Sequence, residues 1–71
     1  MYEVHEGKFD TYMDDVVAIA NTFEEAMELA LEIARKAGHP EPDGKNGYRV
    51  YDEPGGVDGA SWFSYWVMEA E

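Results

Sequence analysis

Residues 22–38, TFEEAMELALEIARKAG, decide the fold of this chain. Thr22 and Glu25 have the spacing of a capping box, in which the threonine hydroxyl accepts a hydrogen bond from a backbone N–H group at the start of a helix. At the other end, Gly38 tolerates a left-handed conformation and Pro40 lies just beyond it. The segment therefore predicts one helix that begins at the Thr22 cap and ends at Gly38.

The side chains of this helix divide into a charged sector and a wide apolar face. Small side chains fill the middle of the apolar face, at Ala26, Ala30, Ala34 and Ala37. Small side chains allow a helix backbone to come close to a flat surface, so we expect this helix to lie against a β-sheet.

Two strands are predicted before the helix. Residues 2–6 begin with alternating apolar and polar side chains, and the alternation around Phe9 leaves open an extension of this strand to Met13. Residues 15–20, DVVAIA, are β-branched and apolar on both faces. Strands that are apolar on both faces are typical of the interior of a sheet, so we place the second strand inside the sheet and not at its edge.

Two more strands are predicted after the helix, at residues 48–53 and 61–68. Residues 38–47 are polar and rich in glycine and proline, and are predicted to be a loop. We therefore expect one α+β domain over residues 1–71, with the order β-β-α-β-β and a mainly antiparallel four-stranded sheet covered on one face by the helix. Some aromatic side chains should then stay partly exposed on the other face, among Tyr12, Tyr51, Phe63, Tyr65 and Trp66.

The composition limits the classes of function that the chain can carry. A chain of 71 residues forms a modest core without a deep pocket. The absence of cysteine excludes a disulfide framework, a thiolate nucleophile and a cysteine-ligated metal site. The N-terminus lacks the basic and apolar regions of a signal peptide, and no apolar run approaches about 18 residues. A cytoplasmic protein without a membrane partner is expected.

No catalytic or cofactor motif stands out. Residues 12–15, YMDD, are identical to the metal-binding signature of reverse transcriptases, but the chain is too short for a polymerase, so we interpret this match as a coincidence. His5 and His39 lack the paired spacing of a metal site. Neither of the two serines lies in the glycine-flanked turn that exposes a nucleophile. We therefore expect a protein that is not an enzyme and that needs no cofactor.

Negative charge is the strongest functional signal. Sixteen acidic side chains against five basic ones give a formal charge of −11. Such a charge disfavours direct binding to nucleic acid or to an anionic membrane. Carboxylates fixed on a folded body can instead occupy the basic groove of another protein, and a purely solubilising role is the alternative. The predicted partner-binding set is Asp14, Asp15, Glu24, Glu28 and Glu32.

In size, charge, lack of cysteine and compact α+β build, the chain resembles the small acidic inhibitors made by bacteriophages, including anti-CRISPR proteins of the DNA-mimic type. The resemblance covers the whole chain but involves no motif, so it assigns no residue. It implies that the protein binds a basic protein or a nucleic-acid-binding complex and blocks its DNA or RNA site. Five basic side chains depart from a uniformly acidic surface: Lys8, Arg35, Lys36, Lys45 and Arg49.

A second hypothesis is a small interaction or self-association module, in which the aromatic sheet face joins two copies as a homodimer. The helix start at residues 22–26, after a short strand, resembles that of HicB-like antitoxins, which implies an antitoxin-like or regulatory subunit. Salt separates the two hypotheses, because charge-driven binding weakens with ionic strength and apolar association does not.

Overall fold

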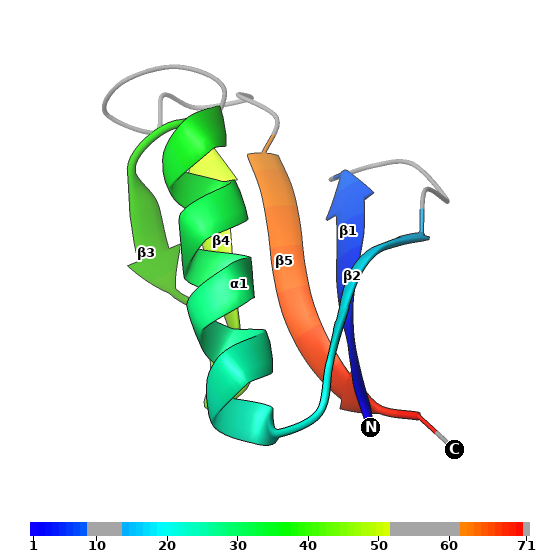
Figure 1. Cartoon of the computed structure of the whole chain (residues 1–71). Helices are drawn as coiled ribbons and strands as arrows, with labels where there is room; N and C mark the ends of the chain where they lie inside the picture. Colours follow the sequence, from blue (N-terminus) through cyan, green and yellow to red (C-terminus); the bar gives the residue numbers. More distant parts are fainter. Residues whose placement is uncertain (9–13, 52–61, 71) are drawn as a thin grey trace.

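The computed structural model describes residues 1–8, 14–51 and 62–70, and predictions for other residues lie outside it. The described residues form a five-stranded sheet with one helix packed on one face (Figure 1). In chain order the elements are β1 (Tyr2–Lys8), β2 (Asp15–Ala20), α1 (Phe23–Ala37), β3 (Pro40–Pro42), β4 (Gly47–Tyr51) and β5 (Trp62–Glu69). The predicted α+β class, with a helix over an antiparallel sheet, is confirmed.

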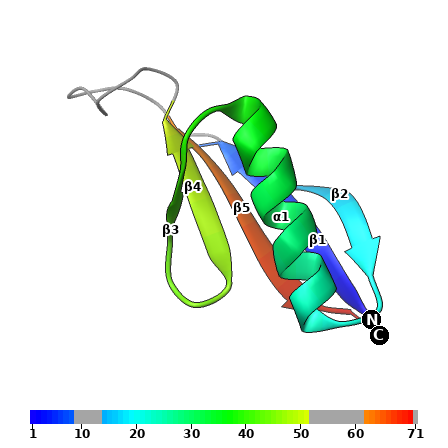
Figure 2. The same ribbon diagram turned by 60° about the vertical axis from the view of Figure 1, so that its left-hand side comes forward.

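Across the sheet the strands have the order β2-β1-β5-β4-β3, and every neighbouring pair is antiparallel. β5 lies at the centre, and β2 and β3 are the two edges (Figure 2). The predicted four strands in the order β-β-α-β-β match only roughly, because a fifth strand, β3, lies within residues 38–47, where a loop was expected. Its sequence, PEP, has no alternating pattern, and proline is tolerated in a sheet mainly at an edge.

The position of β2 also differs from the prediction, since it is an edge strand and not an interior one. Only Ala20 of this strand is buried, whereas Val16, Val17 and Ile19 are exposed. An apolar sequence indicates side chains that gain from burial, but it does not require that this chain itself covers them. The prediction failed because these side chains have no covering layer in the described part of the chain.

α1 begins and ends at the predicted residues. The Thr22 hydroxyl accepts a hydrogen bond of 3.1 Å from the Glu25 backbone N–H, as expected for the helix cap. Gly38, with φ 161° and ψ −143°, is extended and not left-handed, so the predicted conformation was wrong. Glycine is required there for space instead, because a Cβ atom would lie 2.8 Å from Cγ1 of Val50.

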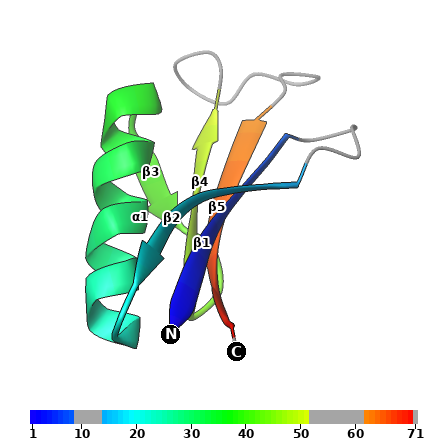
Figure 3. The same cartoon turned by 45° about the vertical axis from the view of Figure 1, so that its right-hand side comes forward.

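The core lies between α1 and the sheet face that it covers (Figure 3). Ala26, Ala30 and Ala34 are completely buried, which confirms the predicted small face of the helix, while Ala37 at its end is exposed. Because the alanines bring the helix close to the sheet, the strands supply the larger buried side chains: Val4, Val50, Tyr65 and Val67.

The turn between β3 and β4 is fastened to the central strand. The Asp43 N–H donates to the Gly47 carbonyl at 3.0 Å and closes the turn. The side-chain amide of Asn46 donates to the Val67 carbonyl at 2.9 Å, and the Val67 N–H donates to the Asn46 carbonyl at 2.8 Å. The polar sequence of this segment therefore serves turn formation and the attachment of the β3–β4 hairpin to β5.

Candidate binding surfaces

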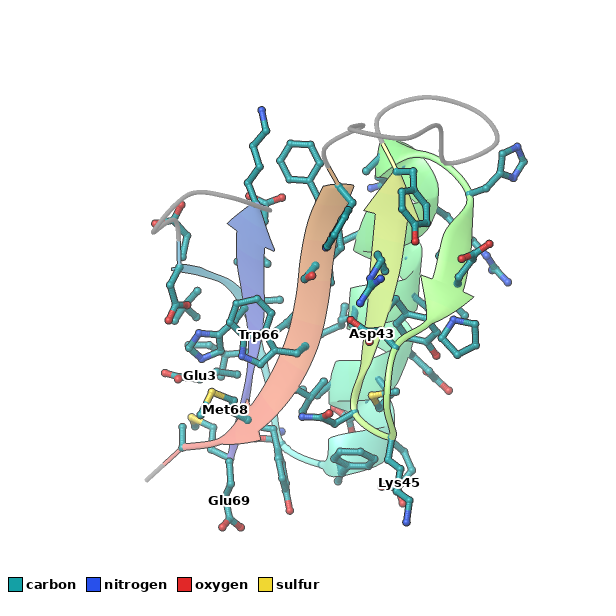
Figure 4. The ribbon with its side chains drawn as sticks, turned by 180° about the vertical axis from the view of Figure 1, so that it is seen from behind. Glu3, Asp43, Lys45, Trp66, Met68 and Glu69 are labelled. Carbon is teal, nitrogen blue, oxygen red and sulfur yellow. The ribbon has the colours of Figure 1, made fainter. Side chains whose placement is uncertain are left out.

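The face of the sheet that α1 leaves uncovered is called the open face here, and Figure 4 shows it directly. The antiparallel register arranges its side chains in rows that cross the strands. One row consists of Ile19, Glu3 and Met68, and the next consists of Val16, His5 and Trp66. Glu3, Trp66 and Met68 accordingly lie side by side over β1 and β5 (Figure 4).

His5 is the centre of a polar cluster on the open face. Its Nδ1 atom lies 2.7 Å from a carboxylate oxygen of Asp14, and its Nε2 atom lies 3.1 Å from one of Glu3. The imidazole ring also stacks on Trp66, with 5.5 Å between the ring centroids. The hydrogen bond with Asp14 is the main cause that raises the pKa of His5, with a smaller contribution from Glu3, while burial opposes it.

Arg49 is the centre of a second cluster on the open face. Its guanidinium carbon lies 4.7 Å from the ring centroid of Trp62, and one terminal nitrogen donates to the Tyr51 hydroxyl at 3.4 Å. The other terminal nitrogen lies 3.4 Å from the Asp43 carboxylate. The hydrogen bond with Tyr51 makes the largest contribution to the raised pKa of Arg49. The positive charge of Arg49 is therefore engaged by groups of its own sheet.

The aromatic side chains of the open face are half-buried and occupied by these clusters. Tyr51 and Trp66 remain partly exposed there, as predicted, whereas Phe63 and Tyr65 lie on the covered face. The most exposed large apolar side chains are instead aliphatic or lie at the helix start: Met1, Val16, Val17, Ile19, Phe23 and Met68.

A row of carboxylates runs along the outer side of α1. Glu24, Glu28 and Glu32 are exposed, and each lies two residues before one of the buried alanines. Two residues correspond to about 200° of helix rotation, so the row faces away from the sheet, with about 6 Å along the axis between successive members. The ion pairs formed among residues 1–8, 14–51 and 62–70 include none of these three carboxylates.

The five predicted contact residues do not lie on one surface. Asp14 contacts His5 on the open face, whereas the glutamate row projects from the helix layer on the other side of the sheet. Asp15 is exposed at the start of β2 and lies opposite Glu6 in the strand register. The sequence places His5 and Glu3 on one face of a strand, but it contains no signal for the contact with Asp14, which depends on the pairing of β1 with β2.

Other classes of site find no support in the described ranges. Within them, no group of three or more histidine, aspartate or glutamate side chains is arranged to hold a metal ion. The helix found in residues 1–8, 14–51 and 62–70, α1, is not long and apolar enough to cross a membrane. Comparisons of the chain with protein families, with curated proteins and with solved structures find no match. Function is therefore inferred from the geometry of the chain itself.

Proposed function

We propose that this chain is a non-catalytic acidic binding protein that occupies the basic, nucleic-acid-binding surface of a partner protein. The supporting observation is the row formed by Glu24, Glu28 and Glu32, three exposed carboxylates without a basic partner in the described chain. The helix that carries them is anchored through the buried alanines on its opposite side. The backbone that carries the row is therefore already fixed before binding, so only the glutamate side chains remain to be ordered.

Charge supports the same proposal. A formal charge of −11 on 71 residues repels itself and lowers the stability of the folded chain, so it is better explained by a role in binding than by folding. Exposed carboxylates accept strong hydrogen bonds from arginine and lysine, and the net charge steers the encounter with a basic groove. Asp15 is exposed on the β2 edge and adds to the net charge without belonging to the helix row, whereas Asp14 is held by His5.

A nucleic-acid-binding complex offers such a basic groove, as the resemblance to DNA-mimic and anti-CRISPR inhibitors of bacteriophages implies. We propose that the protein acts in the cytoplasm, where such complexes work and where a chain without cysteine loses nothing to the reducing conditions.

Self-association through the aromatic open face is the second candidate and is less favoured. Trp62 and Trp66 are half-buried and already stack against Arg49 and His5, so they offer little free apolar surface. Charge repulsion between two copies also opposes a dimer.

Two double variants with the same net charge test the helix row. Glu28→Lys with Glu32→Lys reverses the middle and end of the row. Glu41→Lys with Glu69→Lys reverses two exposed carboxylates outside it. Each glutamate-to-lysine substitution changes the formal charge by +2, so both double variants carry −7, whereas the native chain carries −11. A difference between them therefore reports position and not total charge.

The measurement is affinity capture from a bacterial lysate, with stepwise salt elution and added DNA as competitor. We expect the native chain and the control variant to retain a nucleic-acid-binding protein that salt releases and DNA displaces. The helix variant should lose it, although all three chains melt at similar temperatures. Retention by the helix variant would rule out the row as the contact surface, and retention through high salt would rule out charge-driven binding.

A further inference from the structure

The two edges of the sheet differ in how far they can accept another strand. β3 is three residues long, and Pro40 and Pro42 have no backbone N–H to donate. β2 is six residues long, DVVAIA, and contains neither proline nor lysine, the residues that commonly block an exposed edge. One edge is therefore closed to strand addition, and the other is open.

The open edge also carries exposed apolar side chains. Val16 and Ile19 lie on the open face, because they pair with His5 and Glu3 of β1, and they are 47% and 57% exposed. The register shifts between these pairs, which leaves Val17 as the extra residue of a bulge. The bulge is a feature that can hinder strand addition, and it divides the edge into residues 15–16 and residues 18–20, which both pair with β1.

Charge distinguishes the two ends of the sheet as well. Residues 1–8 and 14–20 contain four acidic side chains and one lysine, whereas residues 40–51 contain two acidic and two basic side chains. Asp15 lies directly opposite Glu6 across β1 and β2, and like charges in this arrangement destabilise a strand pair. A cation placed beside this pair would relieve the repulsion. The open edge is thus apolar and flanked by negative charge.

We propose that the β2 edge binds an extended basic segment of a partner protein, which adds to the sheet as a sixth strand. Backbone hydrogen bonds of the open edge would hold the segment, and alternating side chains would set its chemistry. Apolar residues of the segment pack beside Val16 and Ile19, and its lysines or arginines lie on the opposite face, beside Asp15, with Glu6 one strand further in. A second copy of this chain is the poorer occupant, because it brings the same negative charge to the same edge.

This inference shares with the proposed function only the basic character of the partner, since the surface is a different one. The test is a titration of the ¹⁵N-labelled chain with a short synthetic peptide of alternating valine and lysine, followed by NMR. One control peptide alternates valine with glutamate, and the other alternates glycine with lysine. We expect amide shifts concentrated in β2 with the valine–lysine peptide, weakening with salt, and little response to either control.

Two variants with a formal charge of −10 locate the binding edge. Ile19→Lys places a blocking side chain on the open edge, and Glu41→Gln changes the closed edge by the same charge. We expect Ile19→Lys to lower the affinity for the valine–lysine peptide roughly tenfold or more, because the new charge repels the peptide and the lysine blocks the edge. Glu41→Gln should leave this affinity nearly unchanged. The helix variant Glu28→Lys with Glu32→Lys should still bind the peptide, so this proposal and the helix row can fail separately.

Three outcomes would overturn the proposal. The first is shifts centred on β3, β4 or α1 instead of β2. The second is equal binding of the glycine–lysine peptide, which would mean that charge alone is recognised. The third is a dimer, seen by analytical ultracentrifugation, that salt strengthens and Ile19→Lys abolishes, because the occupant of the edge would then be a second copy.

Discussion

The β1–β2 hairpin and the β3–β4 hairpin form the two ends of one sheet, yet they leave their outer strands in opposite states. The β3–β4 hairpin is fastened to β5 through Asn46 and ends in a short strand blocked by two prolines. The β1–β2 hairpin ends in a longer strand whose valine and isoleucine side chains are exposed. Within the described residues, only the second end combines an edge strand free of proline, exposed apolar side chains and an excess of acidic side chains.

This difference shows that apolar sequence and burial are separable in a small chain. Ala26, Ala30 and Ala34 of α1 are apolar and buried, because the sheet lies directly beneath them. The apolar side chains of β2 are as suited to burial, but the described structure places nothing over Val16, Val17 or Ile19. An edge of this kind favours contact with another polypeptide.

The largest effect is expected from Gly47→Ala, which tests how firmly the β3–β4 hairpin is fastened. A Cβ atom at Gly47 would lie 2.5 Å from the Tyr65 carbonyl oxygen, and backbone cannot yield without disturbing the pairing of β4 with β5. We expect a loss of about 3 kcal/mol in the free energy of unfolding, measured with denaturant.

Gly44→Ala is the matched control in the same turn. Gly44 has a φ of 74° but open space around it, with the nearest atom 3.8 Å from an added Cβ. The free energy of unfolding should fall by about 1 kcal/mol, which is the cost of placing an alanine in a left-handed conformation. Equal losses at the two glycines would contradict the close approach of β4 to β5.

The next effect concerns the helix that spans both ends of the sheet. Ala30→Leu should overpack the completely buried contact and cost about 1 to 3 kcal/mol, seen as a lower melting temperature. Ala37→Leu is the control, since Ala37 is exposed, and it should change stability by less than about 0.5 kcal/mol. An unchanged melting temperature for Ala30→Leu would mean that this face is not buried.

The same substitution at the two ends of the sheet gives an effect of similar size that depends more strongly on position. Val50→Thr places a hydroxyl in the core, where the native side chain is 1% exposed, and should cost about 1 to 3 kcal/mol. Val16→Thr makes the same change on the exposed edge and should cost less than about 0.5 kcal/mol. Similar losses by denaturant unfolding would show that β2 is covered after all.

The smallest effect is a dependence of stability on pH, confined to the β1–β2 end. Folding raises the pKa of His5 above its usual value near 6.5, so its contribution is complete below about pH 6.5 and is lost as the pH rises through the folded pKa. We expect His5→Gln to reduce the fall in unfolding free energy between slightly acid and slightly alkaline pH. Equal pH profiles for His5→Gln and the native chain would exclude the contribution of His5.

Parts of this structure were predictable because a local signal specifies them. Thr22 marks the helix start, the alternation of residues 61–68 assigns the faces of β5, and the alanine row indicates the contact with the sheet. β3 was missed because two prolines in three residues carry no strand pattern. The edge position of β2 was missed because an apolar run is the same whether its own chain or another molecule covers it.

The candidate site was predictable only in part for a related reason. The spacing of Glu24, Glu28 and Glu32 fixes them on one side of a helix, so their common exposure follows from the sequence alone. The position of Asp14 beside His5, and of Asp15 opposite Glu6, depends on strand register, which no single segment encodes. The five predicted residues are therefore divided between the helix row and the β1–β2 end of the sheet.

The most direct test is amide hydrogen exchange of the chain, alone and in complex with the partner captured from the lysate. If a basic partner binds the helix row and its extended segment adds to the open edge, we expect new protection along α1 and in β2, with β3 and its turn unchanged. Protection confined to the β3–β4 hairpin, or to β4 and β5, would contradict both the helix row and the open edge as binding surfaces.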